Sequence, residues 1–285
     1  MELHYRFAGV EICVSMPEEL FYTNEYHLAP FAVDKTGDPI WFSFEKKEKL
    51  DPPAGDLVVK KPGFQIFSDG TRQIRYIGSV ERSWENAYIR VEGDGKEHRV
   101  QVSSGEISGR IGMKTVLNAV GGVHLIARAG GFAFHCSYID YDGKAILFTA
   151  PSETGKSTQA ELWKELRGAE IINGDRAAIR IIDGIATAEG IPFAGSSRYC
   201  ENCSLPIEAI VYLGQAPRTT IRRMRGYEAF ARIWEGVSVN TWDKTDVELV
   251  SKAVKQLAEK VPVYHMPCTP DESAIIALEN ALHNR

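Results

Sequence analysis

The sequence lacks the features that mark secreted, membrane-spanning and nucleic-acid-binding proteins. No apolar run approaches the ~20 residues of a membrane-spanning helix, and the first residues show no signal-peptide hydrophobic segment. The five cysteines are odd in number and widely spread, which is not typical of a disulfide framework. The net charge of −5 provides no broad basic field for nucleic acid or an anionic membrane. We therefore expect a cytoplasmic protein that binds neither.

The composition is that of an ordinary globular protein, with 44% hydrophobic and 25% charged residues. The 285 residues suffice for one large or two modest domains. Residues 1–105 read as a β-rich lobe, and residues 106–285 as a second domain, with the boundary near Ser103–Gly109. The strands expected in the lobe are short runs separated by turns: Leu3–Phe7, Val10–Val14, Leu57–Val59, Phe64–Ile66, Gln73–Ile77, Ala87–Val91 and His98–Val102. A turn-rich region with Pro30, Pro39, Pro52 and Pro53 interrupts them.

The second domain alternates helix and strand patterns. An apolar stripe predicts a helix over Ile107–Ala129, which Gly121-Gly122 bends or interrupts. Phe132–Asp140 is predicted as one strand, joined by a turn in a hairpin to Ala145–Thr149. The elements expected after these are the strands Ala169–Ile172, Ala177–Ile182, Ile185–Ala188, Ile207–Leu213 and Val261–His265 and the helices Tyr227–Trp234, Asp246–Lys260 and Asp271–Leu282.

The stretch from Ala145 to Thr158 organises the chain. An apolar strand runs into a tight loop, and Gly-Lys-Ser-Thr then opens a helix, which is the order of a phosphate-binding loop. Such a loop binds phosphate through backbone N–H groups and the helix dipole. Lys156 would reach the β- and γ-phosphates of a nucleotide, and the Ser157 hydroxyl would bind Mg²⁺. The predicted phosphate-binding residues are Ser152, Glu153, Thr154, Gly155, Lys156, Ser157 and Thr158.

The motif departs from the usual pattern at two positions. Ala150 stands where a glycine is usual, and Glu153 would repel phosphate unless it points away or contacts the metal. The alternative interpretation is an ordinary strand, turn and helix with a chance Gly-Lys-Ser.

Two further side chains are candidates for phosphate chemistry. Asp175 follows an apolar strand, where a carboxylate can hold Mg²⁺ or take a proton from an attacking hydroxyl. Its alternative role is that of a turn residue after Gly174. Arg198, in the loop Gly195-Ser196-Ser197-Arg198, either supplies a positive charge to the transferred phosphate or is a solvated surface side chain.

The run from His135 through Ser-x-x-Gly-Lys-Ser to Gly-Asp-Arg resembles the C-terminal catalytic domain of HPr kinase/phosphorylase and its relatives, some of which are found with ribosomal peptide biosynthesis. That domain shares a P-loop superfamily with phosphoenolpyruvate carboxykinase. The resemblance covers about residues 130–215 by motif, and extends to 285 by the order of elements. It implies that His135 lies near the phosphates, that Lys156 and Ser157 serve phosphate and metal, and that Asp175 is the base.

This chain lacks two acidic residues that the family has near the metal. Gly174 replaces the first Asp of an adjacent pair, and Thr158 replaces a Glu after the loop serine. Either Glu153 or Asn173 compensates, or metal binding is weaker, or catalysis is altered. Of the two reactions of the family, we expect the kinase reaction here rather than the phosphorolysis.

The resemblance implies an α/β fold with a phosphoenolpyruvate carboxykinase/HPr kinase-like P-loop core and a β-rich N-terminal lobe. The expected function is an ATP- and Mg²⁺-dependent kinase that acts on a hydroxyl, most simply a Ser or Thr of a peptide or small protein, with Asp175, His135, Lys156 and Arg198 as catalytic residues and Ser157 and Asp175 at the metal. The alternatives are a small-molecule kinase and a nucleotide-binding regulator or scaffold without turnover. GTP or pyrophosphate as donor, and a homo-oligomer, are equally compatible with the sequence.

A local basic run precedes the predicted helix at Tyr227. It consists of Arg218, Arg222, Arg223 and Arg225. Such a run is usually a solvated face, and the alternative is a docking surface for an acidic peptide.

Overall fold

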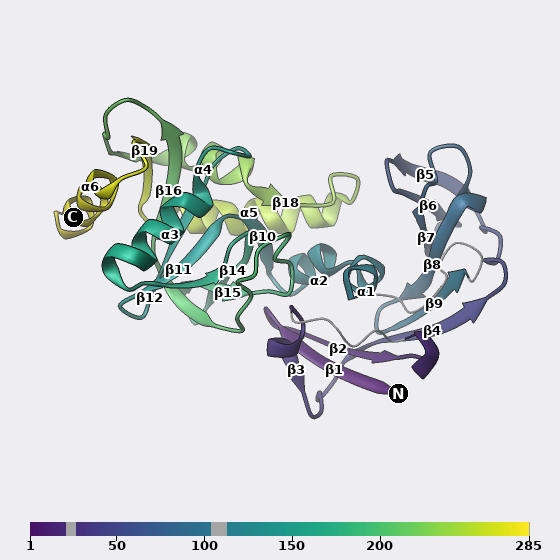
Figure 1. Cartoon of the computed structure of the whole chain (residues 1–285). Helices are drawn as coiled ribbons and strands as arrows, with labels where there is room; N and C mark the ends of the chain where they lie inside the picture. The colour runs from purple at the N-terminus through teal and green to yellow at the C-terminus, as the bar shows by residue number, and fades with distance from the viewer. Residues whose placement is uncertain (21–26, 104–112, 285) are drawn as a thin grey trace. The chain divides into compact units, whose positions relative to one another are not determined.

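The computed structural model describes residues 1–20, 27–103 and 113–284. These residues form two compact units, Met1–Leu125 and Ile126–Arg285, each built around a large mixed sheet (Figure 1). The protein is therefore a mixed α/β structure. Most of the segment in which the sequence predicts the boundary, Ser103–Gly109, lies outside the described residues.

The N-terminal unit contains a nine-stranded sheet with the order β3-β1-β2-β4-β9-β8-β7-β6-β5. Its strands are β1 (Glu2–Phe7), β2 (Val10–Ser15), β3 (Ala32–Val33), β4 (Ile40–Lys47), β5 (Asp56–Lys61), β6 (Phe64–Ser68), β7 (Gln73–Gly78), β8 (Ala87–Asp94) and β9 (Glu97–Ser103). The pairs β2–β4 and β4–β9 are parallel, and the other neighbours are antiparallel. All seven strands that the sequence predicts here are present.

The central strand β4 is absent from the sequence prediction, which assigned its region to turns. Pro39 lies directly before the strand, so it costs no hydrogen bond within the ladder. Within β4 the side chains alternate, with Phe42 and Phe44 buried and Ser43 exposed. That alternation is the period-2 signal of a half-buried strand, and the neighbouring prolines obscured it.

The helix predicted over residues 107–129 is two helices in the structure. These are α1 (Met113–Val120) and α2 (Gly122–Arg128), and residues 107–112 lie outside the described part of the chain. Gly121 separates the helices with a φ of 64°, a left-handed conformation that glycine adopts without steric cost. The predicted interruption at Gly121-Gly122 is confirmed.

The C-terminal unit contains a ten-stranded sheet that branches at one long strand, β16 (Ser204–Gln215). Its other strands are β10 (Gly131–His135), β11 (Ser137–Tyr141), β12 (Lys144–Thr149), β13 (Glu170–Asn173), β14 (Arg176–Ile182), β15 (Ile185–Gly190), β17 (Arg222–Met224), β18 (Val237–Ser238) and β19 (Val263–Cys268). The first half of β16 pairs with β15, and its second half lies parallel between β12 and β19.

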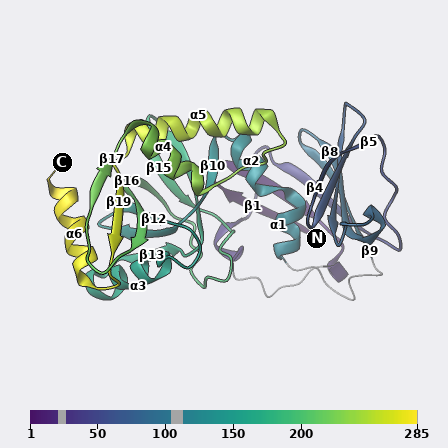
Figure 2. The ribbon, with the colours of Figure 1, turned by 90° about the horizontal axis from the view of Figure 1, so that it is seen from above.

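Four helices cover the two faces of this sheet (Figure 2). They are α3 (Lys156–Arg167), α4 (Gly226–Glu235), α5 (Lys244–Lys260) and α6 (Glu272–His283). Adjacent residues of the central strands point to opposite faces: Leu147 packs with α4 and α5, whereas Ile146 and Phe148 pack with α3 and α6. Because both faces are covered, these strands read as continuous apolar runs.

The strand predicted over Phe132–Asp140 is wrong in one respect, because the structure has two strands there. β10 pairs with β14 and β18, whereas β11 pairs with β12 and β13. Cys136 lies between them, fully buried, and its N–H donates to the carbonyl of Asp175 at 3.0 Å. The chain thus changes partners at this point, which brings His135 and Ser137 beside Asp175.

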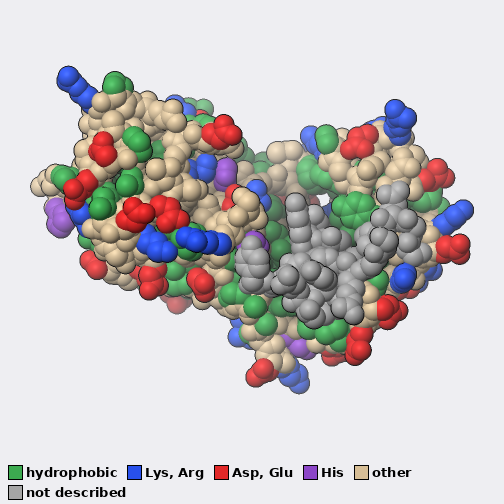
Figure 3. All heavy atoms as spheres, in the orientation of Figure 1, with side chains coloured by type: hydrophobic (Ala, Val, Ile, Leu, Met, Phe, Trp, Pro, Cys, Tyr) green, Lys and Arg blue, Asp and Glu red, His purple; other side chains and the backbone are tan. Residues whose placement is uncertain are grey.

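The distribution of charged side chains on the surface and the length of the helices agree with what the sequence predicts. Acidic and basic side chains are interspersed over the face shown in Figure 3, in keeping with a net charge of −5. Among the described residues, every helix is too short or too polar to cross a membrane.

Candidate active site

The loop between β12 and α3 has the backbone geometry of an anion-binding cradle. β12 ends at Thr149 and α3 begins at Lys156. Glu153 and Gly155 have φ angles of 63° and 115°, so the handedness of the backbone alternates along the loop, and such alternation turns successive N–H groups toward one point. Within the described residues, no acceptor takes a hydrogen bond from any backbone N–H between Ser152 and Thr158. The loop therefore presents unpaired donors at a helix N-terminus, where anions bind.

Lys156 is held inside this loop. Its side chain is buried, with 8% exposed, and Nζ donates to the carbonyls of Ala150 and Pro151 at 3.0 and 3.1 Å. Burial lowers the pKa of Lys156, and the nearby Asp175 carboxylate opposes that shift. The carbonyl of Ala150, the residue that replaces the usual glycine, thus accepts a hydrogen bond from the Lys156 ammonium group. Only these two carbonyls hold Nζ among the described residues, so an anion could replace them.

Asp175 lies among three charged or titratable groups. Its carboxylate oxygens are 3.6 Å from His135 Nε2 and 3.5 Å from Arg176 Nε. His135 and Arg176 face each other across the β10–β14 pair, which fixes this spacing. Burial lowers the pKa of His135, as does the ammonium of Lys156, while Asp175 raises it. The imidazole is therefore biased toward its neutral form, in which it can accept or donate a proton.

Asn173 holds the backbone at Asp175 in place through its buried side chain. Its side chain is fully buried, and Oδ1 accepts hydrogen bonds from the N–H groups of Asp175 and Arg176, both at 2.9 Å. Its Nδ2 donates to the carbonyl of Ile191 at 3.0 Å. Because both ends of the amide are in use, Asn173 is not free to replace a missing acidic metal ligand. This removes one of the two compensations that the sequence suggested.

The residue before Asp175 has no room for a side chain. A Cβ added at Gly174 would overlap the hydroxyl oxygen of Ser197 and lie 2.8 Å from its Cβ. The same loop approaches Asp175 through Gly195, whose φ is 56° and where an added Cβ would lie 3.0 Å from the Asp175 Cγ. Asp175 is therefore the single carboxylate at this turn, and the loop 194–198 packs against it.

A cavity of about 560 Å³ opens between the loop that joins β12 to α3, Asp175 and the 194–198 loop. We call the loop between β12 and α3, residues 150–155, the phosphate loop. Predicted site residues that line the cavity are His135, Ser152, Glu153, Lys156, Ser157, Asp175 and Arg198. Thr154 and Gly155 belong to the loop and Thr158 to the first turn of α3, and none of the three lines the cavity. The structure thus brings together residues that lie as far apart in the sequence as His135 and Arg198.

Arg198 is turned toward its neighbour. Its Nη2 donates to the Tyr199 hydroxyl at 2.8 Å, and its guanidinium lies 4.9 Å from the ring centroid. Lys164 of α3 contacts the same hydroxyl at 3.1 Å. Two cations therefore gather at Tyr199, which also lines the cavity. Tyr199, Ser137 and Glu161 are lining residues that the sequence motifs did not mark.

The donor set suits a phosphate with a divalent cation. The unpaired N–H groups and Lys156 match phosphate oxygens, and the Ser157 hydroxyl and Asp175 carboxylate are oxygen ligands of the kind Mg²⁺ prefers. Two protein oxygens fill only part of the octahedral coordination of Mg²⁺. Waters and substrate phosphates commonly supply the other ligands. The residues present therefore fit a phosphate group with Mg²⁺.

Comparisons with known proteins leave the family of this chain open. No protein-family model and no curated protein matches it. Among solved structures, the HPr(Ser) kinase/phosphatase from Coxiella burnetii is similar with a TM-score of 0.33 and 12% identity, over 53% of this chain and 88% of that one. That TM-score is too low to establish a shared fold, so the function must follow from the residues of this chain.

Proposed function

We propose that this protein is an ATP- and Mg²⁺-dependent phosphotransferase that acts on a hydroxyl group, a Ser or Thr of a peptide or small protein. The observation that supports it best is the cavity in which the unpaired N–H groups of the phosphate loop, Lys156 and Asp175 meet. Phosphoryl transfer needs little besides positioning and charge neutralisation, and these groups supply both.

Each residue has a role that follows from its place in the cavity. The loop N–H groups and Lys156 bind the phosphates, and Ser157 with Asp175 holds the metal, which when bound neutralises charge on the transferred group. Asp175 also takes the proton of the attacking hydroxyl. His135, 3.6 Å from Asp175 and biased toward its neutral form, adds no positive charge that would weaken this base.

One observation favours a second function, that of a nucleotide-binding regulator without turnover. Ser197 fills the space that a side chain at Gly174 would need, so Asp175 is the single carboxylate at that turn and serves both as metal ligand and as base. Glu153 and Glu161 also line the cavity. A site without the paired carboxylates at the turn can bind Mg²⁺ and nucleotide and still transfer phosphate slowly. Phosphate transfer and nucleotide binding must therefore be measured separately.

The first experiment is a calorimetric titration of the wild-type protein with ATP and Mg²⁺, beside Lys156→Met and Asp175→Asn. We expect Lys156→Met to lose at least about tenfold in affinity, because charge-assisted hydrogen bonds to phosphate are among the strongest in proteins. Asp175→Asn should still bind the nucleotide. Lys260→Met, an exposed lysine at the end of α5, is the matched control and should bind as wild type does.

The second experiment measures ADP formation and phosphopeptide products with a mixture of Ser- and Thr-containing peptides. Asp175→Asn should lower transfer by at least about a hundredfold, the usual range for loss of a general base. Nucleotide binding without ADP formation in the wild type would favour the regulator instead. If folded wild-type protein bound neither ATP, GTP nor pyrophosphate, both functions would be wrong.

A further inference from the structure

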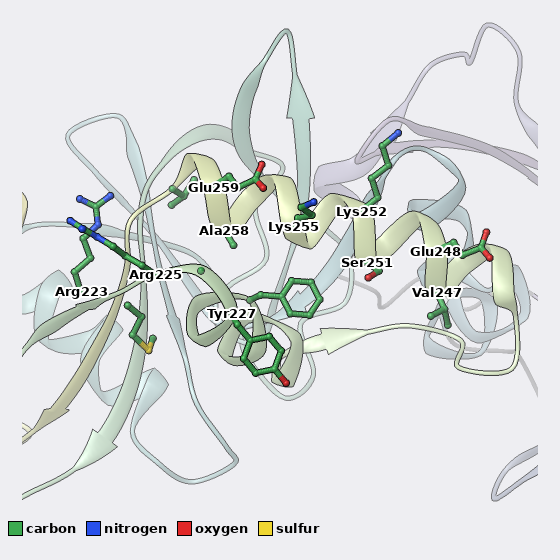
Figure 4. A pocket seen from close by; sticks show the side chains of 14 residues that line it. Arg223, Arg225, Tyr227, Val247, Glu248, Ser251, Lys252, Lys255, Ala258 and Glu259 are labelled. Atoms are coloured by element: carbon green, nitrogen blue, oxygen red, sulfur yellow. The ribbon is translucent and has the colours of Figure 1, made fainter.

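A hollow larger than the cavity at Asp175 lies away from the phosphate loop, between α4, α5 and β17. Its volume is about 960 Å³, and it shares no lining residue with the cavity at Asp175. Arg223 and Arg225 lie at one end of it, and Val247 and Glu248 at the other (Figure 4). We call this hollow the α4–α5 groove.

The groove has an apolar lining with one prominent aromatic side chain. Met224 and Val261 are buried in it, and Phe230 and Ala258 are half-buried. Tyr227, on the first turn of α4, is 84% exposed although it lines the groove. A large exposed ring beside an apolar groove is typical of a binding surface, because tyrosine offers apolar contact and a hydroxyl at low entropic cost.

The rim of the groove carries unpaired cations. Arg223, Arg225, Lys252 and Lys255 are exposed and form no ion pair within the described parts of the chain. Their neighbour Arg222, in contrast, is paired with Glu228, with Nη1 2.9 Å from Oε2. A protein with a net charge of −5 thus places four cations at one apolar groove, against the two carboxylates Glu248 and Glu259. Their potential favours an anionic partner.

The groove continues past the two arginines. A second hollow of about 580 Å³ also contains Arg223 and Arg225 in its lining and extends to Ala277 and Asn280 of α6. Between the two hollows runs β17, which pairs with β19 alone among the described strands, so one of its edges carries no partner strand. The two hollows and this edge form a path suited to an extended chain.

We propose that the α4–α5 groove and the edge of β17 bind an acidic peptide segment, with an apolar side chain in the groove and carboxylates on Arg223 and Arg225. Glu248 and Glu259 also line the groove, and they would repel the uniform negative charge of a nucleic acid. A peptide can place its carboxylates at the arginines and an apolar residue between the glutamates.

This binding site is remote from the phosphate loop. Met224 of β17 pairs with Val263, at the amino end of β19, whereas the phosphate loop follows the carboxyl end of the parallel strand β12. A peptide bound here would be recognised apart from any reacting hydroxyl. The proposal therefore holds or fails independently of phosphotransfer.

The test is fluorescence anisotropy of the whole protein with a labelled peptide of about twelve residues, which contains several Asp and Glu, one Phe and one Leu. We expect saturable binding that weakens at high salt, because ions screen exposed charges. Two matched peptides should each bind at least about tenfold more weakly. One has Asn and Gln in place of the acids, and the other has Ser in place of Phe and Leu.

Variants assign the binding to the groove. The double variant Arg223→Glu and Arg225→Glu should lose at least about tenfold in affinity, and Tyr227→Ala should lose part of it. The double variant Arg218→Glu and Lys260→Glu changes the net charge equally outside the groove, and should bind as wild type does. Circular dichroism confirms that each variant is folded.

Three outcomes would overturn the proposal. The first is absence of saturable binding by the acidic peptide, and the second is an equal loss in the two double variants. The third is equal or tighter binding of a single-stranded oligothymidylate of the same charge, which would indicate a nucleic-acid surface. Loss of peptide binding with intact nucleotide binding leaves the proposed phosphotransfer untouched.

Discussion

The cavity at the phosphate loop and the α4–α5 groove belong to the same unit, but their polar groups are held in opposite ways. In the cavity, Asn173 uses both ends of its amide, Lys156 is buried against two carbonyls, and Asp175 lies between His135 and Arg176. In the groove, the cations Arg223 and Arg225 are exposed and, over residues 1–20, 27–103 and 113–284, have no carboxylate partner.

The difference indicates what each hollow can do. Chemistry requires side chains fixed to within a fraction of an ångström, and buried hydrogen bonds supply that order. Recognition of a flexible chain tolerates mobile charges at a rim, which act mainly on the rate and selectivity of association. We therefore expect substitutions in the cavity to cost stability, and substitutions in the groove to leave it nearly unchanged.

The largest effect should come from Asn173→Ala. It leaves the N–H groups of Asp175 and Arg176 without their acceptor in a buried turn, and it leaves the carbonyl of Ile191 with the weak Cys200 thiol donor in place of the amide. Lost buried hydrogen bonds of this kind cost about 2–4 kcal/mol of unfolding free energy in total, measurable by urea denaturation. Tyr227→Ala, at an exposed ring of the groove, should cost under about 0.5 kcal/mol. Equal losses would contradict the contrast between the two hollows.

An intermediate effect is expected from Gly174→Asp. The new Cβ would overlap the Ser197 hydroxyl, and relief of such a clash typically costs about 1–3 kcal/mol. The double variant Gly174→Asp and Ser197→Gly should recover most of the loss, because the hydroxyl and its Cβ are gone. A double-mutant cycle measures this coupling. If the two substitutions were additive, Ser197 would not be the obstacle at this position.

The smallest effect is a pH dependence that His135 should cause. Its pKa in the folded protein lies below the ordinary value of 6.5, so the unfolded chain binds the proton more readily. Stability contributed by the neutral ring is complete above about pH 6.5 and is lost as the pH falls through the lowered pKa. The effect is small because about one third of the ring is exposed to water.

The measurement compares the unfolding free energy of wild type and His135→Gln between about pH 7.5 and 5.5. Wild type should lose stability relative to the variant as the pH falls. In a Lys156→Met background the difference should shrink, because the ammonium is one cause of the lowered pKa. A wild type that gains stability relative to His135→Gln on acidification would show that Asp175 dominates instead.

Much of the fold follows from local pattern. Asp-Gly pairs favour hairpin turns, and both Asp142-Gly143 and Asp183-Gly184 lie in hairpin turns in the structure. β4 was missed because its alternation lies among prolines, and β10 and β11 were merged because no turn residue separates them at Cys136. A change of pairing partner leaves no trace in hydropathy when both partners are buried.

The candidate site was predictable in part. The phosphate loop and Asp175 carry local signals, since Gly-Lys-Ser and the end of an apolar strand are contiguous in the sequence. Asn173 also carries a local signal, because an Asn side chain commonly accepts a hydrogen bond from the backbone N–H two residues further on. The structure shows this hydrogen bond, from the N–H of Asp175, in place of the metal contact that the sequence suggested. The packing of Ser197 against Gly174 carries no local signal, because it joins two loops.

The sequence by itself determined the strand β12, the loop after it and the helix α3, since left-handed glycine, helix propensity and apolar runs act between near neighbours. Tertiary structure decided which side chains face that cradle. The pairing of β10 with β14 brings His135 to Asp175, and the packing of α4 beside α5 joins an exposed tyrosine to four exposed cations. Such contacts depend on long-range packing, which no short stretch of sequence specifies.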